Sequence, residues 1–257
     1  MLAHTAIHEA RQEYRQAGFT VLSGLFDHDE IRLMKKRVDQ AWMNELACKR
    51  IVQNQANPVT SLFQPIRMDF QFSVTKDLVL QPKLFEALEK LFESKVLIVG
   101  STCFFKAPGE KKLPLHQDQY DIGAYPEASF AAWISLDDAD PENGGLIMAP
   151  ETHREGLLRP SVYSNRPNVV GMTFPLPENK SLVDIVTAPG DVVVFDGLLL
   201  HGSHSNISPN RFRRSIVIQC ARESIESIFV NHDNLFSRNG RRTVRKMNKR
   251  HSLYRHV

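Results

Sequence analysis

The stretch that decides the fold is residues 190–203, which read Gly190-Asp191-Val192-Val193-Val194-Phe195-Asp196-Gly197-Leu198-Leu199-Leu200-His201-Gly202-Ser203. Pro189 and the first two residues of this stretch form a turn signal. The apolar runs that follow predict two short strands, at residues 192–195 and 198–203. His201 falls within the second strand. Its imidazole can take part in a metal site only if other ligands lie elsewhere in the sequence.

The upstream residues that matter most are the triplet His116-Gln117-Asp118. In an extended segment the side chains at positions i and i+2 point the same way, so His116 and Asp118 can aim at one point. Two histidines and one carboxylate are the ligand set of non-haem Fe(II) oxygenases, which leaves adjacent coordination positions open. A lone triplet of this kind also fits a surface turn, so the sequence around it has to decide.

The composition is that of an ordinary globular protein. Of its 257 residues, 42% are apolar and 24% charged, which is enough for a core with an internal pocket. No run approaches the roughly 18 apolar residues of a membrane span, and the N-terminus has no apolar signal core. The C-terminus is not a peroxisomal address, and Cys48, Cys103 and Cys220 lack metal-site spacing. We expect a cytoplasmic protein with reduced thiols and no membrane partner.

The net charge of +3 hides an asymmetry between the body of the chain and its C-terminus. The last 20 residues carry eight Lys or Arg and no acid, which leaves 24 basic against 29 acidic residues elsewhere. Such a tail can dock a phosphate-bearing partner, for instance a carrier protein or a CoA-bound substrate. It also fits a solvated, partly helical tail that lies on the acidic body. We expect a small-molecule substrate and no nucleic-acid partner.

The periodicity predicts helices first and strands later. Helices are expected at residues 4–17, at 82–94, and after Asp27, where Asp27 and Glu30 form a capping box before a helical apolar stripe. Loops are expected at residues 51–76 and 150–182. Strands are expected at residues 19–22, 96–106, 129–136, 146–148, 183–187, 192–195, 198–203 and 215–221, with a hairpin turn at Asn143-Gly144.

This order predicts a mainly β protein with flanking helices, in which helices pack on one antiparallel core of sandwich or barrel type. We expect a single domain over residues 1–257. Its parts are a helical N-terminal part at about 1–95, a core at about 96–222 and a basic C-terminal extension at about 223–257.

Six ordered segments carry a family resemblance. They are Leu115–Gln119, Trp133–Asp137, Asn143–Leu146, Pro150–His153, Gly190–Ser203 and Asn206–Arg214. Taken in this order, they resemble the phytanoyl-CoA dioxygenase family of Fe(II)- and 2-oxoglutarate-dependent oxygenases. The similarity runs from about Leu115 to Gln219, with a weaker echo over Gly18–Trp42. The resemblance implies a double-stranded β-helix, also called a jelly roll, with a cupin-like core.

The resemblance also implies roles for particular residues. It puts iron on His116, Asp118 and His201, and it puts the 5-carboxylate of 2-oxoglutarate on an arginine downstream of His201. A guanidinium grips a carboxylate with two parallel hydrogen bonds. The candidate arginines are Arg211, Arg213 and Arg214.

Strand parity favours Arg213 among these arginines. It groups Arg213 with Ser215, Val217 and Gln219, and it groups Arg214 with the apolar residues of the opposite face. An apolar outer face against the helices and a more polar pocket face would fit the implied architecture.

Other residues complete the expected site. Ser203 can bind the same carboxylate as the arginine, although it also fits an ordinary buried hydroxyl. Trp133 can line the cosubstrate pocket or belong to the core. Lys106, Gln117 and Arg67 are expected at the edge of the substrate pocket.

The reaction implied by the resemblance is hydroxylation of a C–H bond by Fe(II), 2-oxoglutarate and O2, with release of succinate and CO2. A carboxylate at Asp118 disfavours halogenation, whereas desaturation and cyclisation use the same ligands. The loops at 51–76 and 154–182 are expected to form a lid over the pocket. They contain Arg67, Arg159, Arg166, Phe63, Phe70 and Tyr163, which suits a mid-sized polar or amphipathic molecule.

Candidate substrates are a natural-product intermediate, an amino-acid derivative or a carrier-bound acyl group. Two alternatives remain open at this point. One is a cupin-type metalloenzyme that uses no 2-oxoglutarate. The other is a catalytically degenerate jelly-roll protein that binds a partner through its basic tail.

Overall fold

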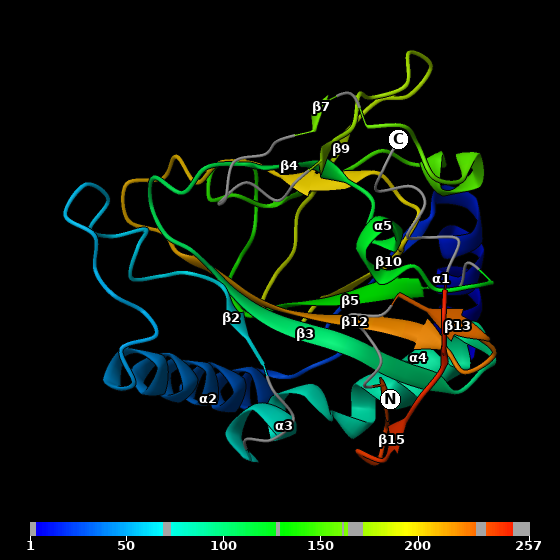
Figure 1. Cartoon of the computed structure of the whole chain (residues 1–257), viewed down its shortest axis with the longest axis horizontal. Helices are drawn as coiled ribbons and strands as arrows, with labels where there is room; N and C mark the ends of the chain where they lie inside the picture. Colours follow the sequence, from blue (N-terminus) through cyan, green and yellow to red (C-terminus); the bar gives the residue numbers. More distant parts are fainter. Residues whose placement is uncertain are drawn as a thin grey trace.

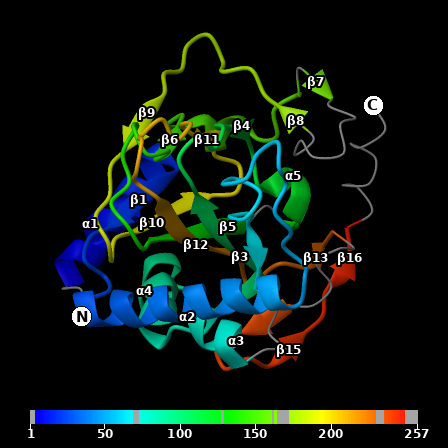
Figure 2. The same cartoon turned by 90° about the vertical axis from the view of Figure 1, so that its left-hand side faces the viewer.

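The computed structural model describes residues 4–68, 73–126, 129–160, 162–163, 172–229 and 235–248. Within them, helices cover one side of a large antiparallel sheet, and a smaller sheet lies on its other side (Figures 1 and 2). This is the expected mainly β architecture with flanking helices. None of the described helices is long and apolar enough to cross a bilayer.

The large sheet has the strand order β1-β10-β5-β12-β3-β14-β15, and β2 also pairs with β3. Its longest pairing joins β12 to β3, with Arg213 opposite Lys106 and Gln219 opposite Gly100. The strands are β1 (Phe19–Leu22), β2 (Ile66–Arg67), β3 (Val96–Lys106), β5 (Ser129–Ser135), β10 (Val192–Asp196), β12 (Arg213–Arg222), β14 (Leu235–Ser237) and β15 (Arg242–Thr243).

The smaller sheet has the order β4-β11-β6-β9. Its strands are β4 (Leu113–His116), β6 (Leu146–Met148), β9 (Val183–Ile185) and β11 (His201–Ser203). Consecutive strands alternate between the two sheets: β5 is followed by β6, and β9 by β10. The predicted hairpin at Asn143-Gly144 is therefore wrong, because this turn joins β5 to β6, which lie in different sheets. The expected strand at 198–203 begins only at His201.

The helices pack against the outer face of the large sheet. They are α1 (His4–Ala17), α2 (His28–Ala47), α3 (Ser73–Val79) and α4 (Pro82–Phe92), with the short α5 (Gln119–Ile122) and the 3-10 turn η1 (Thr152–Glu155) near the smaller sheet. The capping box of Asp27 and Glu30 is present at the start of α2. Helix α3 lies partly within a segment that was expected to be a loop.

Strand alternation separates two cores. Ile216, Ile218 and Cys220 of β12 point to the outer core with the helices. Val217 packs instead on the core between the sheets, with Trp133 and Phe195. Because side chains alternate along a strand, Arg213, Ser215 and Gln219 share the inner face with Val217. The predicted parity of β12 is therefore confirmed.

In the described part of the C-terminal extension the regular elements are short strands. Strand β14 extends the large sheet, with Phe236 opposite Ile98 of β3, and β13 (Ser227–Ile228) pairs with β16 (Lys246–Met247). Leu235 is fully buried. The expected partly helical tail is therefore wrong over residues 235–248, because these residues complete a sheet edge. The short pair β7 (Val162–Tyr163) and β8 (Met172–Thr173) lies in the long excursion.

Candidate functional site

Three potential metal ligands converge beside β4 and β11 of the smaller sheet. His116 ends β4, His201 begins β11, and the two residues are direct partners in the register. Asp118 precedes α5, and its Oδ1 lies 3.5 Å from Nε2 of His116 and 3.9 Å from Nε2 of His201. The ligand atoms of the three residues all lie within 4.8 Å of one another. The fold therefore brings the predicted triad together.

The local geometry differs from the one expected. Asp118 has φ −59° and ψ −32°, which is helical backbone rather than extended backbone. Its carboxylate reaches His116 because the chain turns directly after β4, and not because both residues alternate along one strand. His116 and Asp118 therefore do not share one strand face as predicted, although their side chains converge.

Both imidazoles are oriented by the main chain. Nδ1 of His116 lies 2.9 Å from the carbonyl oxygen of Pro114, and Nδ1 of His201 lies 2.9 Å from that of Leu199. A carbonyl only accepts, so Nδ1 must donate and the proton sits there. Each Nε2 atom faces Asp118 and is the ring atom left for metal ligation. This arrangement fits a divalent metal with nitrogen and oxygen ligands.

The charges also suit a metal site. Burial raises the pKa of Asp118, but the neighbouring imidazoles of His116 and His201 lower it to about 2. Burial, with a contribution from His116, lowers the pKa of His201 to about 4. A carboxylate and a neutral imidazole at neutral pH are the protonation states that bind metal.

Gln117 has other contacts than those expected for a substrate-binding residue. It is buried, and its amide nitrogen donates to the carbonyl oxygens of Gly156 (2.9 Å) and Leu198 (2.6 Å). Its amide oxygen accepts from the backbone nitrogen of Leu158 at 2.8 Å. Gln117 therefore ties the triad to two loops, and we treat it as a positioning residue instead of a substrate contact.

The three candidate arginines separate clearly. Arg214 makes ion pairs with Asp137 and Asp39, whereas Arg211 binds Asp140 and Glu142. Arg213 is 5% exposed and is in no ion pair with the residues that the structure describes. A buried guanidinium without a carboxylate is suited to an incoming anion.

The surroundings of Arg213 hold it in place. Nη1 donates to Ser215 Oγ at 2.7 Å, and Nε and Nη2 donate to the carbonyl oxygen of Gly144 at 3.2 and 3.1 Å. The guanidinium lies 5.5 Å from the ring centroid of Trp133. Trp133, expected either at the cosubstrate or in the core, packs in the core between the sheets and lies beside Arg213.

Ser203 and Lys106 lie next to this arginine. Ser203 is buried and accepts a hydrogen bond from Nζ of Lys106 at 2.7 Å. Lys106 is paired with Arg213 across β3 and β12. Lys106, expected at the substrate edge, therefore lies instead beside the candidate cosubstrate arginine.

The inner face of β3 and β12 is the open part of the site. Thr102, Phe104, Val217 and Gln219 are partly exposed there, whereas the matching residues of β5 and β10 are buried. Arg67 is exposed and lies opposite Thr102 at the edge of this face. Among the other lid residues that were expected, Phe70, Arg166 and the side chain of Tyr163 lie outside the described residues.

Sequence reasoning missed two supporting residues. The side chain of Gln219 on β12 helps to lower the pKa of Asp118, and Gly144 supplies the carbonyl that orients Arg213. Strand parity from Arg213 placed Gln219 on the pocket face, but it could not show which ligand it reaches. No signal in the sequence links Gly144 to Arg213, since 69 positions separate them.

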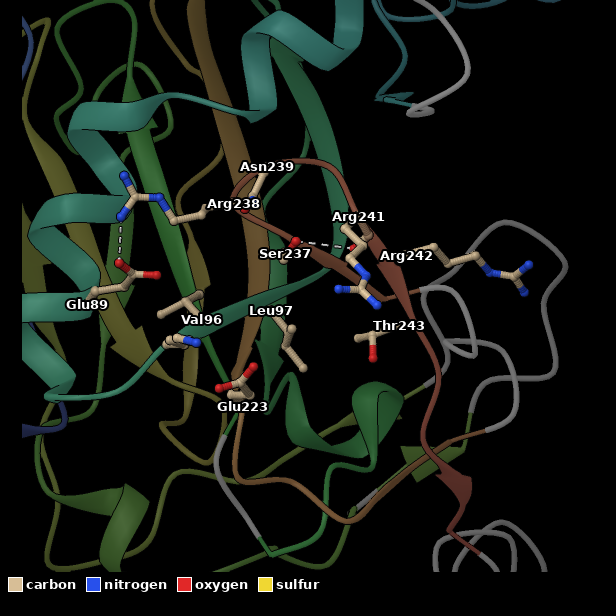
Figure 3. Close-up of a pocket in the computed structure, with 11 residues that line it drawn as sticks. Glu89, Val96, Leu97, Glu223, Ser237, Arg238, Asn239, Arg241, Arg242 and Thr243 are labelled. Carbon is tan, nitrogen blue, oxygen red and sulfur yellow. Dashed lines mark hydrogen bonds and ion pairs between the residues drawn. The ribbon is translucent and has the colours of Figure 1, made fainter.

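A surface pocket of about 470 Å³ lies elsewhere, between α4, β3 and the C-terminal strands (Figure 3). Its lining includes the basic residues Lys95, Arg238, Arg241 and Arg242. Arg238 is neutralised by Glu89, which it meets at 2.8 Å. No member of the triad lines this pocket, so it is separate from the candidate metal centre.

Comparison with known proteins decides the family. The sequence profile described as "Phytanoyl-CoA dioxygenase (PhyH)" matches residues 14–215. The chain belongs to the phytanoyl-CoA dioxygenase family. By family it is an Fe(II)- and 2-oxoglutarate-dependent dioxygenase, and its donor set of two histidines and one carboxylate fits that chemistry.

Individual relatives are distant. A phytanoyl-CoA dioxygenase of Arabidopsis thaliana is 24% identical over 236 residues, covering 76% of this chain and 82% of the relative. The peroxisomal phytanoyl-CoA dioxygenase of Bos taurus is 27% identical over 228 residues, covering 81% of this chain. The chain spans only 66% of the length of this bovine relative.

Solved structures agree on the fold. The epimerase SnoN, crystallised with Fe3+, alpha ketoglutarate and nogalamycin RO, superposes with a TM-score of 0.66 at 17% identity. The match covers 87% of this chain and 86% of SnoN. The predicted cupin-like jelly roll is therefore confirmed.

Proposed function

We propose that this protein hydroxylates an unactivated C–H bond of a small molecule, with Fe(II) held by His116, Asp118 and His201. The observation that carries the proposal is the convergence of two Nε2 atoms and one carboxylate oxygen, with both Nδ1 atoms bound to backbone carbonyls. When bound, the iron, with 2-oxoglutarate and O2, supplies an oxidant that can break a C–H bond, and succinate and CO2 are released.

The chain's own residues have distinct tasks in this scheme. Asp118 supplies the negative charge of the ligand set, and the nearby Gln219 side chain helps to keep it ionised. Arg213 binds the distal carboxylate of 2-oxoglutarate, because it is buried and in no ion pair among the described residues. Ser203, on the strand that carries His201, and Trp133, at 5.5 Å from the guanidinium, border the same cosubstrate site.

The substrate would lie against the open inner face. Thr102, Phe104 and Val217 offer it a mixed polar and apolar surface, and Arg67 stands at its edge. This surface suits a mid-sized polar or amphipathic molecule, such as a natural-product intermediate, an amino-acid derivative or a carrier- or CoA-bound acyl group. The names of the relatives include a CoA thioester, and SnoN was crystallised with nogalamycin RO.

Arg213 also separates the proposal from its main alternative. In a cupin-type metalloenzyme without 2-oxoglutarate, no bound carboxylate would offset the cost of burying the Arg213 guanidinium. Such an enzyme would tolerate Arg213→Ala without any change in cosubstrate affinity. An intact triad likewise argues against a degenerate binding protein.

The test is an anaerobic titration of Fe(II)-loaded protein with 2-oxoglutarate, followed through the visible metal-to-ligand charge-transfer band. A band that saturates at one equivalent and is absent in His116→Ala supports the proposal. Candidate substrates are then screened by succinate release. Iron-replete, folded protein that shows no band would refute the 2-oxoglutarate assignment.

Three further expectations stay predictions. They are a single domain over residues 1–257, a cytoplasmic location, and a docking role for the basic C-terminus toward a carrier protein or CoA. Removing residues 249–257 tests the docking role, because turnover of a free substrate should persist while turnover of the carrier-bound form falls.

A further inference from the structure

Two buried cations face each other at the end of the inner face. Lys106 ends β3, Arg213 begins β12, and they are direct partners in the antiparallel register. Each is only 5% exposed. Neither side chain is in an ion pair with any residue of the described ranges. The folded chain therefore holds two like charges together, away from water.

Such a pair is unfavourable without an anion. Burial, and then the charge of Arg213, lowers the pKa of Lys106 to about 7, while burial lowers the pKa of Arg213 to about 10. Glu110 offsets part of the charge on Lys106 but makes no ion pair with it in the described structure. A carboxylate placed between the two cations would remove this penalty.

The hydrogen bonds of Lys106 show that its ammonium can still donate to an incoming carboxylate. The ammonium of Lys106 has three protons, and one of them is directed to Ser203 Oγ at 2.7 Å. Ser203 lies two residues after His201 on β11. Lys106 therefore reaches from Arg213 toward the strand that carries a metal ligand.

Gly144 contacts both cations: it binds Arg213 through its carbonyl oxygen and leaves room for the side chain of Lys106. Its carbonyl oxygen accepts from Nε and Nη2 of Arg213. A Cβ at position 144 would collide with Cδ and Cε of Lys106, so a side chain there would displace the lysine. With φ at +89°, the backbone here also favours glycine. Gly144 therefore lets the stem of Lys106 pass over the turn that orients Arg213.

We propose that Lys106 is a second cation for the distal carboxylate of 2-oxoglutarate, acting beside Arg213 and Ser203. This inference rests on the proposed function and changes the role of Lys106 from a substrate contact to a cosubstrate contact. Its consequence is selectivity: the site distinguishes 2-oxoglutarate from a 2-oxo acid of equal length without the distal carboxylate. Lysine and arginine together bind that group more tightly than arginine alone.

The experiment compares two acids on Fe(II)-loaded protein without O2, again through the charge-transfer band. The probes are 2-oxoglutarate and 2-oxopentanoate, which has the same five carbons and no distal carboxylate. The proteins are the wild type, Lys106→Met and the control Lys112→Met, which alters an exposed lysine of the following loop. Because the band requires a folded metal site, the second acid also reports whether the variant is intact.

Lys106→Met should weaken 2-oxoglutarate binding by about 10- to 100-fold, the usual effect of losing a buried charge-assisted hydrogen bond. Its affinity for 2-oxopentanoate should stay within about threefold of the wild type, and Lys112→Met should change neither. Equal losses for both acids would overturn the inference and make Lys106 a support of the fold. Unchanged 2-oxoglutarate binding would also overturn it. A wild type without any band would instead remove the proposed function itself.

Discussion

His116 and His201 face each other directly across β4 and β11, with their ring centroids 4.2 Å apart. Each ring is held by the carbonyl two residues before it. The smaller sheet therefore preorganises two nitrogen ligands, and the turn after β4 adds the carboxylate of Asp118.

Asp118→Asn should lower metal affinity by more than about 100-fold, since losing a ligand costs more than losing the groups that orient ligands. The change keeps the shape of the side chain and removes only its charge. Anaerobic titration with Fe(II) or Co(II) measures the effect. Asp138→Asn, at an exposed position, is the matched control and should bind metal like the wild type. Unaltered metal binding by Asp118→Asn would exclude this residue from the site.

Arg213→Met and Arg214→Met should have opposite phenotypes. Arg214 binds both carboxylate oxygens of Asp137, at 2.9 and 3.0 Å, so its loss should cost about 1–3 kcal/mol of folding stability. That corresponds to roughly 2–4 °C of melting temperature per kcal/mol in a chain of this size. Arg213→Met loses its hydrogen bonds to Gly144 and Ser215 but also removes the like charge beside Lys106, so its melting temperature should stay close to that of the wild type. It should lose at least about tenfold in 2-oxoglutarate affinity. Thermal denaturation and 2-oxoglutarate titration of both variants check this. Lost 2-oxoglutarate affinity in Arg214→Met, with normal affinity in Arg213→Met, would mean that Arg214 binds the cosubstrate.

Lys106→Met should stabilise the metal-free protein at pH 7, because it removes a buried cation next to Arg213. Burial and Arg213 lower the pKa of Lys106 from 10.5 to about 7, so between these values the unfolded chain holds a proton that the folded chain lacks. The stability of the wild type therefore rises with pH across this window. The variant should lack this contribution.

Urea denaturation of the metal-free proteins at pH 7.0 and 9.5 measures the difference. Lys112→Met should follow the wild type at both values. If Lys106→Met showed the same pH slope as the wild type, Lys106 would not titrate in this range.

Gln117→Leu should loosen the triad without touching a ligand. It removes the hydrogen bonds by which Gln117, between two metal ligands in the sequence, is tied to the main chain at Gly156, Leu158 and Leu198. We expect metal affinity to fall by about 10- to 100-fold, as for other groups that orient ligands. Metal titration tests this, with Gln12→Leu on the exposed face of α1 as the control. A metal affinity equal to that of the wild type would show that the hydrogen bonds of Gln117 do not influence metal binding.

Leu235→Ala should destabilise the protein by about 2–5 kcal/mol, because Leu235 is fully buried where β14 joins β3. Val244→Ala, at a position that is 58% exposed, should change the stability by less than about 0.5 kcal/mol. Denaturant unfolding of both variants measures the difference. Equal stabilities would mean that the C-terminal strands are only loosely attached.

Local patterns predicted most of the elements correctly. The strand at Phe19–Leu22, the helix at His4–Ala17 and the capping box at Asp27 all depend on neighbouring residues, and the structure has them as expected. The first part of α3 was expected to be a loop, and the chain turns at Asn143-Gly144 without forming the expected hairpin. A turn signal specifies a change of direction but does not show which strands then pair, and here the strands belong to two sheets.

The sequence by itself determined the ligand types and the pocket face of β12, because residue chemistry and strand alternation are local properties. Only the tertiary structure decided how these groups meet. In the folded chain Asp118 has helical backbone, the amide of Gln117 is hydrogen-bonded to the main chain, and Lys106 is paired with Arg213. The contacts of Gln117 and Lys106 join residues 39 to 107 positions apart, and local preference contains no information about such distances. The register of two antiparallel sheets sets them instead, and with them the electrostatics of the site.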